Sequence, residues 1–426
     1  MIFTDDQERA IKAIKNGNNV MITGPGGTGK TTVINHFKDI FNDLVLGITA
    51  MTGSAAVIIG GTTLHSYLGI GLGTDSVDNL VRKIKKNTKL KKRWIRTDIL
   101  VVDEISMLSA DLFDKLNSVA KNVRKPQEPF GGMQLVFGGD FLQLPCINGE
   151  FCFESKAWVE CMFEIFHFTE IMRQTDIRFQ SCLNRARLGR MTDDDFDYIT
   201  QNTPTTERIK SMEIKPTRIL CENVDVDKIN TNKLNKLHDE NIYEYKYKVE
   251  HTDHYDPQEH DFMFKDITKL CNTKPKLHLS KGAQVMLIVN IDVKKGLVNG
   301  SRGVITNFHE YVTISSNGQE KIKYIPIVKF HDTEIIIKQH SYEIRDRNNI
   351  IAHIIQIPLK LAYAVTVHKS QGMTLDSAII DLKGVFEYGQ AYVAISRVRD
   401  VNNLFIKNVT KSTFKAHPKA LEFYAK

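Results

Sequence analysis

The sequence predicts an α/β fold built on two doubly wound parallel sheets. Short apolar runs recur along the 426-residue chain, and in its first half four polar or glycine-rich motifs each begin where such a run stops. Runs of this kind are typical of strands buried on both faces of a parallel sheet. Because ligands bind beside the carboxyl ends of such strands, we expect the four motifs to meet at one cleft.

The first motif, GPGGTGKT at residues 24–31, fits the phosphate-loop pattern G-x-x-x-x-G-K-[ST]. A strand-like run, NVMIT at 19–23, precedes it, and TTVINHFKDIF at 31–41 has the apolar spacing of a helix. This setting favours a nucleoside triphosphate site over a glycine-rich turn without a ligand. Lys30 would reach the β- and γ-phosphates, and the Thr31 hydroxyl would hold Mg²⁺. The predicted nucleotide-binding residues are Gly24, Gly26, Gly27, Thr28, Gly29, Lys30, Thr31 and Thr32.

Two later runs end in residues suited to phosphate chemistry. DILVVDEIS at 98–106 places Asp103 and Glu104 at the end of a buried strand, where acids that only cap the strand would be costly. We expect Asp103 to hold Mg²⁺ and Glu104 to activate the attacking water. In QLVFGGDFLQLP at 134–145, Gln143 would contact the γ-phosphate.

Other polar residues before and after the phosphate loop have two interpretations. Gln7 carries an amide that matches the donor and acceptor edge of adenine, although a surface residue is the simpler interpretation. The segments AMTGSAA (50–56) and GGTTLHSYLGIG (60–71) suit backbone approach to a phosphodiester chain. Ordinary βα loops explain them equally well.

Residues 82–96, RKIKKNTKLKKRWIR, carry nine basic side chains and no acid. Dense positive charge beside an aromatic ring favours single-stranded nucleic acid, with Lys86 and Trp94 as contacts. A solvated basic loop and a nuclear targeting signal are the alternatives. If the segment flanks a DNA fork, the phosphates would be held by Lys83, Lys85, Lys86, Lys89, Lys91, Lys92 and Arg93.

The second half repeats the strand-like runs less regularly, at 216–223, 360–372, 377–382 and 403–408, with a helix pattern at 388–398. Between them, 276–357 is β-rich and has hairpin-prone Asn299-Gly300 and Asn317-Gly318, which predicts a small inserted barrel. The charged stretch 238–261 contains four histidines. We interpret it as an aperiodic, solvated connection rather than a metal site.

Composition narrows the class of protein. With 42% hydrophobic and 25% charged residues the chain is globular, and it has neither a membrane-length apolar run nor a signal peptide pattern. Six cysteines form no C-x-x-C pair, which predicts reduced thiols in an intracellular compartment, nuclear, cytoplasmic, viral or organellar. The net charge of +7 permits a polyanionic partner.

The motif series as a whole resembles that of PIF-type DNA helicases of superfamily 1B, related to the phage Dda and bacterial RecD helicases. The resemblance runs from Gln7 to about residue 406, through VVDEIS, GGDFLQLP, EIMRQTD, GLVNGSRG, AVTVHKSQGMTLD and AYVAISRVRD. It implies a DNA-stimulated ATPase that uses ATP and Mg²⁺, moves 5′-to-3′ on single-stranded DNA and unwinds duplex or forked DNA. It would act in DNA replication, recombination, repair or telomere maintenance. Separately from the resemblance, we expect the chain to be a monomer.

The resemblance also implies domains and residue roles. Residues 1–170 would form a first RecA-like domain, which contains a wedge subdomain at about 66–96. A second RecA-like domain would comprise 171–275 and 358–426, and an SH3-like subdomain at 276–357 would be inserted in it. Gln7 would read adenine, and Arg173 and Arg397 would be arginine fingers from the second domain. The implied DNA contacts are Thr52, Thr63, His65, Thr366, His368, Lys369 and Ser370.

Two alternatives to a helicase are a degenerate relative that binds DNA without turnover and a phosphate-loop ATPase such as a packaging motor. The first is disfavoured because Lys30, Asp103, Glu104 and both arginines are present. The second would not need the HKSQG loop or a second arginine-bearing domain.

Overall fold

A computed structural model describes residues 3–425 except 147–148, 203–204, 213, 238–240, 262–263, 265–273, 293–294, 296, 315–319, 331–332 and 347–348. The chain forms two compact units: Met1–Thr192 with Phe386–Ser396 and Lys411–Lys426, and Asp193–Val385 with Arg397–Thr410. These units do not follow the predicted RecA-like domain ranges, which stay predictions. Among the described residues, no helix is both long and apolar enough to cross a membrane.

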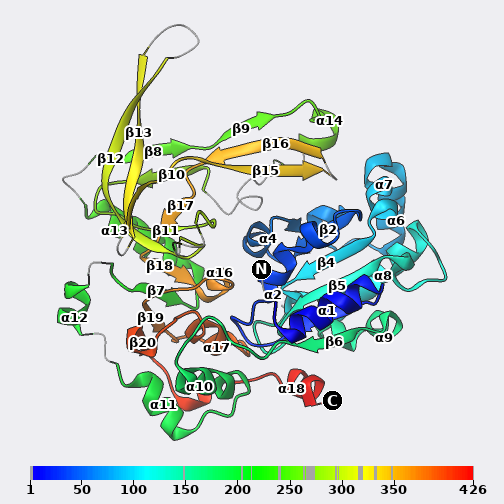
Figure 1. Cartoon of the computed structure of the whole chain (residues 1–426), viewed down its shortest axis with the longest axis horizontal. Coiled ribbons are helices and arrows are strands. Elements are labelled where there is room, and N and C mark those ends of the chain that lie inside the picture. The colour runs from blue at the N-terminus through cyan, green and yellow to red at the C-terminus, as the bar shows by residue number, and fades with distance from the viewer. Residues whose placement is uncertain are drawn as a thin grey trace. The chain divides into compact units, whose positions relative to one another are not determined.

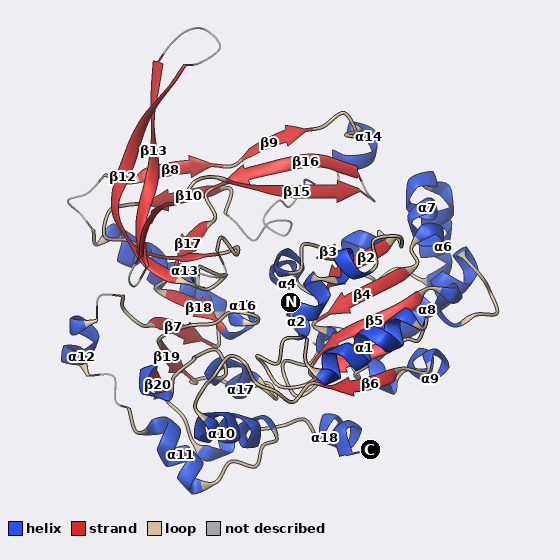
Figure 2. Cartoon of the chain, viewed as in Figure 1, coloured by secondary structure: helices blue, strands red, loops and turns tan. Residues whose placement is uncertain are grey.

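A six-stranded parallel sheet forms the centre of the first unit, with helices on both faces (Figures 1 and 2). Its order is β3-β2-β4-β5-β1-β6, so every strand has its carboxyl end at the same edge. The predicted parallel sheet and its four motif-bearing strands are therefore confirmed. The strands are β1 (Val20–Thr23), β2 (Leu46–Ala50), β3 (Thr62–Thr63), β4 (Ile99–Asp103), β5 (Gln134–Gly139) and β6 (Glu164–His167).

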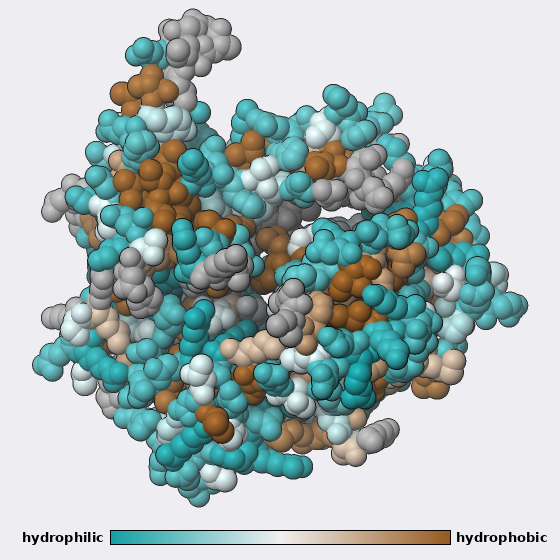
Figure 3. Space-filling model, in the orientation of Figure 1, coloured by the Kyte–Doolittle hydropathy of each residue, from teal (hydrophilic) through white to brown (hydrophobic). Residues whose placement is uncertain are grey.

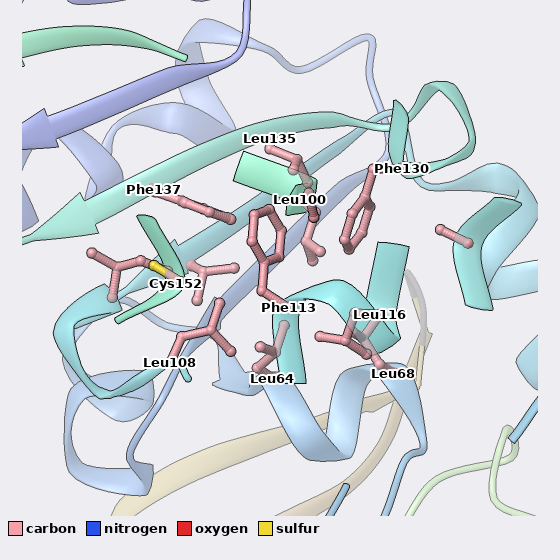
Figure 4. Packing of buried hydrophobic residues seen from close by; sticks show 14 of the residues in the cluster. Leu64, Leu68, Leu100, Leu108, Phe113, Leu116, Phe130, Leu135, Phe137 and Cys152 are labelled. Atoms are coloured by element: carbon pink, nitrogen blue, oxygen red, sulfur yellow. The ribbon is translucent and has the colours of Figure 1, made fainter. Parts of the chain in front are cut away.

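Strand β4 shows how the sheet is buried on both faces. Ile99 and Val101 pack into one hydrophobic cluster, whereas Leu100 and Val102 pack into another. In the second cluster the ring centroid of Phe113 lies 5.8 Å from that of Phe130 and 5.4 Å from that of Phe137 (Figure 4). This alternation explains why the strand reads as a continuous apolar run.

The helices of the first unit follow the strands along the chain. The predicted helix at 31–41 is divided at His36 into two short helices, whose buried residues include Val33, Ile34 and Phe37. The helices are α1 (Asp5–Lys15), α2 (Lys30–Asn35), α3 (Phe37–Ile40), α4 (Gly53–Ile58), α5 (Leu64–Leu68), α6 (Val77–Lys86), α7 (Thr88–Arg96), α8 (Ala110–Val123), α9 (Lys156–Cys161), α10 (Ile177–Arg187), α17 (Gln390–Ile395) and α18 (Pro418–Ala425).

The second unit contains a four-stranded parallel sheet of order β18-β7-β19-β20. The strand-like runs predicted in the second half of the chain coincide with these strands. They are β7 (Thr217–Leu220), β18 (Ala364–Thr366), β19 (Ala378–Asp381) and β20 (Leu404–Lys407). The helices of this unit are α11 (Asp193–Thr200), α12 (Thr206–Ser211), α13 (Asn223–Asn235), α14 (Pro257–His260) and α16 (Val367–Ser370).

Antiparallel sheets make up the rest of the second unit, in the orders β14-β13-β12-β11-β17, β15-β16-β9 and β10-β8. Asn299-Gly300 lies between β11 and β12, with Gly300 at φ 95°, while Asn317-Gly318 lies outside the described residues. The strands are β8 (Tyr243–Lys246), β9 (Lys248–His251), β10 (Lys276–Leu279), β11 (Gln284–Leu287), β12 (Arg302–Ile314), β13 (Glu320–Phe330), β14 (Thr333–Ile336), β15 (His340–Asp346), β16 (Asn349–Gln356) and β17 (Leu359–Leu361).

The prediction of an aperiodic connection at 238–261 is wrong. The stretch contains β8, which pairs with β10, and β9, which pairs with β16. It also contains α14, whose His260 is 3% exposed and accepts a hydrogen bond at Nδ1 from the Asp256 N–H. Residues 238–240 lie outside the described part.

The long β12–β13 hairpin carries exposed apolar side chains, visible as hydrophobic surface in Figure 3. Val312 and Ile322 are directly paired across the two strands and are 57% and 53% exposed. The residues between them at 315–319 lie outside the described chain.

Candidate nucleotide-binding site

The phosphate loop connects β1 to α2, as predicted. Lys30 extends back over the loop, and its ammonium donates to the carbonyl oxygens of Gly24 at 2.7 Å and Pro25 at 2.8 Å. The Thr28 hydroxyl donates to Pro25 O at 3.0 Å and is buried. These contacts hold the lysine at the centre of the loop, where a phosphate-binding cation is required.

Glycine is required in this loop for packing as well as for conformation. A Cβ on Gly27 would lie 2.7 Å from Arg173 Cβ, and one on Gly29 would lie 2.7 Å from Gln7 Nε2. Both glycines have positive φ values, 91° and 81°. The loop is therefore enclosed by the Gln7 and Arg173 side chains.

Gln7 is a buried residue of α1, so the surface interpretation is wrong. It is 3% exposed, and its Nε2 donates to Thr28 O at 3.5 Å. Its Oε1 accepts from the Thr4 N–H, which completes a capping box at the start of the helix. Helix α1 thereby places this amide against the phosphate loop.

The acidic pair lies at the carboxyl end of β4. Asp103 is 4% exposed and accepts from the Glu104 N–H at 2.8 Å and the Thr31 hydroxyl at 3.5 Å. Burial raises the pKa of Asp103, although the Glu104 N–H and Lys30 oppose this effect. Glu104 has a φ of 56°, a left-handed value that is uncommon for a residue other than glycine. The two predicted acids thus occupy neighbouring positions beside the loop.

Gln143 lies on the loop after β5, next to a buried ion pair. Asp140 accepts two bonds from Arg187, at 2.8 Å from Nε and 2.7 Å from Nη2. Gln143 Nε2 donates to the same carboxylate at 3.4 Å. Burial would raise the pKa of Asp140, but Arg187 and Lys30 bring it below its ordinary value. The carboxylate is therefore ionised at neutral pH.

Charge from these acids also reaches Lys30. Burial lowers the pKa of Lys30 to about 8, while the carboxylates of Asp140, Glu104 and Asp103 act in the opposite direction. Asp103 ends β4, Glu104 follows it and Asp140 follows β5, so the effect indicates that the ends of two strands converge on the lysine.

Arg173 is placed differently from the prediction. It belongs to the first unit, and its Nη1 donates to Ser396 O at 3.2 Å. Its Cβ lies against Gly27 of the phosphate loop, so it is a residue of the loop's own unit. Arg397 belongs to the second unit and is 2% exposed.

The predicted DNA contacts of the first unit follow β2 and β3. Thr52 caps α4 by accepting from the Ala55 N–H, and Thr63 caps α5 by accepting from the Ser66 N–H. Both threonines are half-buried, as is His65, whose pKa is lowered by burial. The three residues therefore remain candidates for contact at the strand-end edge.

In the second unit the equivalent residues follow β18. Thr366 caps α16 by accepting from the Lys369 N–H, and the Ser370 hydroxyl donates to Val367 O at 2.7 Å. These two residues are 1% and 0% exposed, which contradicts direct DNA contact through either hydroxyl. His368 is half-buried and Lys369 is exposed, so they are the candidates that remain.

The basic segment 82–96 forms two helices instead of a loop. Trp94 is 1% exposed, and its indole N–H donates to Leu68 O at 3.1 Å, so the predicted DNA contact through its ring is wrong. Arg93 donates to Tyr67 O at 2.7 Å and lies over the Tyr67 ring. Lys86 is exposed, together with Arg82, Lys83, Lys85, Lys91, Lys92 and Arg96.

Three site residues were not predicted: Arg187, Tyr392 and Tyr424. The Tyr392 hydroxyl accepts from the Gly26 N–H at 3.0 Å, and the Tyr424 hydroxyl lies 2.6 Å from the Thr23 hydroxyl. A signal existed for Arg187 itself, because it continues the helical spacing of the apolar residues Phe179, Cys182, Leu183 and Ala186, although this spacing does not identify its acid partner. No spacing pattern links the two tyrosines to the loop.

Comparison with known proteins identifies the family of this chain. A family described as PIF1-like helicase matches residues 2–195, and one described as DNA helicase Pif1, 2B domain, matches 266–308. The ATP-dependent DNA helicase PIF1 of Xenopus laevis is 38% identical over 99% of this chain. The match covers 64% of that relative, so the chain spans slightly less than two thirds of its length.

Solved structures give the same result over the whole chain. The Pif1 helicase from Candida albicans is 33% identical, with a TM-score of 0.74, and the match covers 100% of this chain and 99% of that one. The Pif1 helicase from Bacteroides in complex with ADP-AlF3 and ssDNA is 28% identical, with a TM-score of 0.67 and coverage of 100% and 97%. The chain therefore belongs to the PIF1-like helicase family.

Proposed function

We propose that this PIF1-like helicase hydrolyses ATP to move 5′-to-3′ along single-stranded DNA and to unwind duplex DNA. The observation that carries the proposal is the convergence of Lys30, Asp103, Glu104 and the Gln143 loop at one edge of the first unit's sheet. The nucleotide and ssDNA in the Bacteroides relative support the two ligands. Polarity, and a role in replication, recombination, repair or telomere maintenance, follow from the family resemblance.

In the proposed reaction, Lys30 offsets the charge of the γ-phosphate and Gln143 contacts it. Glu104 accepts a proton from the attacking water, while Gln7 contacts adenine. The Thr31 hydroxyl and Asp103 carboxylate lie 3.5 Å apart and are oxygen ligands of the kind that Mg²⁺ prefers. When bound there, the ion would neutralise phosphate oxygens.

The arginines supply positive charge to the developing transition state. Arg173 adjoins the phosphate loop through Gly27, which supports its role as one finger. Arg397 is proposed as the second finger, from the second unit. Charge spreads over the γ-phosphoryl oxygens during transfer, and a finger is typically worth about 10³-fold or more in rate.

We propose that both units bind DNA and that the protein acts as a monomer. Thr52, Thr63 and His65 would contact the strand from the first unit, and His368 and Lys369 from the second. The exposed lysines of α6 and α7, Lys86 among them, would hold phosphates at the fork. Movement follows if each unit's grip on DNA changes with the nucleotide state.

Unwinding of tailed duplexes tests this function directly. We expect ATP-dependent strand separation of a duplex with a 5′ single-stranded tail and none with a 3′ tail of equal length. Glu104→Gln should bind ATP but unwind neither, because an amide accepts no proton from water. Glu8→Gln, which changes an exposed glutamate of α1, is the matched control and should unwind normally. Absence of unwinding on both substrates by the wild-type chain would contradict the helicase function, and unwinding from the 3′ tail would contradict the polarity.

A further inference from the structure

The hydroxyl of the half-buried Tyr424, on α18, bonds to three buried residues of the first unit. Three groups surround its oxygen: Thr23 Oγ1 at 2.6 Å, the Phe141 N–H at 3.1 Å and Asp140 Oδ1 at 3.3 Å. A phenol donates one hydrogen bond and accepts others. If Tyr424 donates to Asp140 and accepts from Phe141 and Thr23, all three contacts are satisfied together.

Asp140 fixes the direction of these bonds. Its carboxylate is ionised and pairs with Arg187, so it can only accept. The Arg187 guanidinium carbon also lies 5.1 Å from the centre of the Tyr424 ring. Burial raises the pKa of Tyr424, which favours the protonated hydroxyl.

The groups that Tyr424 joins adjoin the phosphate loop and the loop after β5 that carries Gln143. Thr23 is the last residue of β1, directly before Gly24, whose carbonyl accepts from Lys30. Phe141 follows Asp140, and Gln143 is tied to Asp140 through both its backbone N–H at 3.0 Å and its side chain at 3.4 Å. A single hydroxyl therefore connects the base of the phosphate loop to the base of the Gln143 loop.

Packing alone does not require this hydroxyl. Phe423 anchors α18 in a cluster of aromatic rings. Its ring centroid lies 4.6 Å from that of Phe153 and 5.0 Å from that of Phe141. A phenylalanine at position 424 would keep the ring contacts and lose only the polar ones. The partners of this hydroxyl are buried and each is bonded to it, which is the arrangement expected of a group that sets geometry.

We infer that Tyr424 is a positioning residue for ATP hydrolysis, which keeps the Gln143 loop in register with the phosphate loop. The inference rests on the proposed ATPase function. Gln143 and Lys30 must address the same γ-phosphate, and small misplacements of such groups reduce the rate of the chemical step more than they reduce binding.

Steady-state kinetics of Tyr424→Phe test the inference. We expect kcat for DNA-stimulated ATP hydrolysis to fall about tenfold, the loss typical of leaving buried polar partners unpaired, with KM for ATP nearly unchanged. An unchanged kcat would overturn the inference. If the wild-type chain itself fails to hydrolyse ATP, the proposed function fails instead, so the two failures are distinguishable.

Two matched variants separate positioning from simple loss of stability. Tyr388→Phe removes a hydroxyl from a 39% exposed ring of the same unit and should behave like wild type. Phe423→Leu weakens the α18 ring cluster without removing a hydrogen bond. We expect it to lower Tm while kcat, measured well below Tm, stays near wild type. A loss of kcat in Phe423→Leu equal to that in Tyr424→Phe at the same loss of Tm would show a structural role only and overturn the inference.

Discussion

The parallel sheets of the two units use the same local arrangement but expose different groups. In the first unit β2 and β3 lead to Thr52 and Thr63, and in the second β18 leads to Thr366, each threonine capping a short helix. The first two are half-buried, whereas Thr366 is 1% exposed and Lys369 is the exposed residue beside it. A strand followed by a threonine cap therefore orients a helix, and burial decides which side chain can contact a ligand.

The units also divide the proposed ATP chemistry unequally. The first holds the phosphate loop, both acids and Arg173, whereas the second contributes Arg397. We therefore expect substitutions in the first unit to affect ATP binding, the rate of hydrolysis and the stability of the fold. Substitutions in the second unit should affect only the rate of hydrolysis or the affinity for DNA. The following predictions test this division, from the largest effect to the smallest.

Arg397→Ala should lower kcat for ATP hydrolysis by about 10³-fold or more, because the finger acts on charge that develops in the transition state. ATP affinity, measured with a fluorescent analogue, should change only modestly. Arg399→Ala, at an exposed arginine two residues later, is the control. A large loss of affinity with unchanged turnover at saturation would assign Arg397 to ground-state binding.

Asp140→Asn should destabilise the first unit by about 3–5 kcal/mol at pH 7, because it leaves the Arg187 guanidinium buried without its counter-charge. The pKa of Asp140 is lowered in the folded state, so its contribution is present above the ordinary value of 3.8 and is lost as pH falls below it. The difference from wild type in urea unfolding should therefore shrink in acid.

Asp111→Asn is the control for this stability measurement, since that carboxylate is 88% exposed. It should change the unfolding midpoint little at either pH. An Asp140→Asn protein as stable as wild type at pH 7 would show that the ion pair contributes no net stability.

Neutralising Lys85, Lys86 and Lys92 to glutamine should flatten the log–log salt dependence of forked-DNA binding by about two units, because each phosphate contact contributes about 0.7–0.9. The same change at Lys12, Lys15 and Lys156, exposed lysines elsewhere in the first unit, is the control. A slope equal to wild type would make the basic helices a solvated surface.

Lys369→Gln should reduce the salt slope for single-stranded DNA by about 0.7, the value for one phosphate contact. Thr366→Val should leave the slope unchanged, because the Thr366 hydroxyl is buried. Lys383→Gln serves as the control, at an exposed lysine of the same unit. A change of slope in Thr366→Val alone would reverse the assignment of contacts in this unit.

The convergence of the motifs that carry the candidate nucleotide site was predictable, because parallel topology places strand-end motifs at one edge regardless of their separation in sequence. Lys30 and Asp103 needed only this rule. Arg187 and its partner Asp140 are 47 residues apart and meet through tertiary packing, and Tyr424 comes from a helix with no motif. Long-range polar networks of this kind leave no spacing pattern in the sequence.

The errors on Trp94 and residues 238–261 have a common physical cause. Both interpretations were based on the high density of charged residues, and they overlooked the regular spacing of the apolar residues between them. Leu90 and Trp94 are four residues apart, as are the buried Leu80 and Ile84 of α6, which is helical spacing. In YEYKYKVE at 243–250, half-buried tyrosines and valine alternate with exposed charges, which is the period of a strand with one solvated face.

The most direct test of the account is the rate of ATP hydrolysis by the wild-type chain with and without saturating single-stranded DNA. We predict that kcat rises clearly with DNA. Lys30→Ala should show no hydrolysis in either condition, because the variant lacks the ammonium group that offsets the charge of the γ-phosphate. Lys12→Ala, at an exposed lysine of α1, should respond to DNA like wild type. Hydrolysis that is equal with and without DNA would contradict coupling between the ATP site and DNA, and turnover in Lys30→Ala would contradict the site itself.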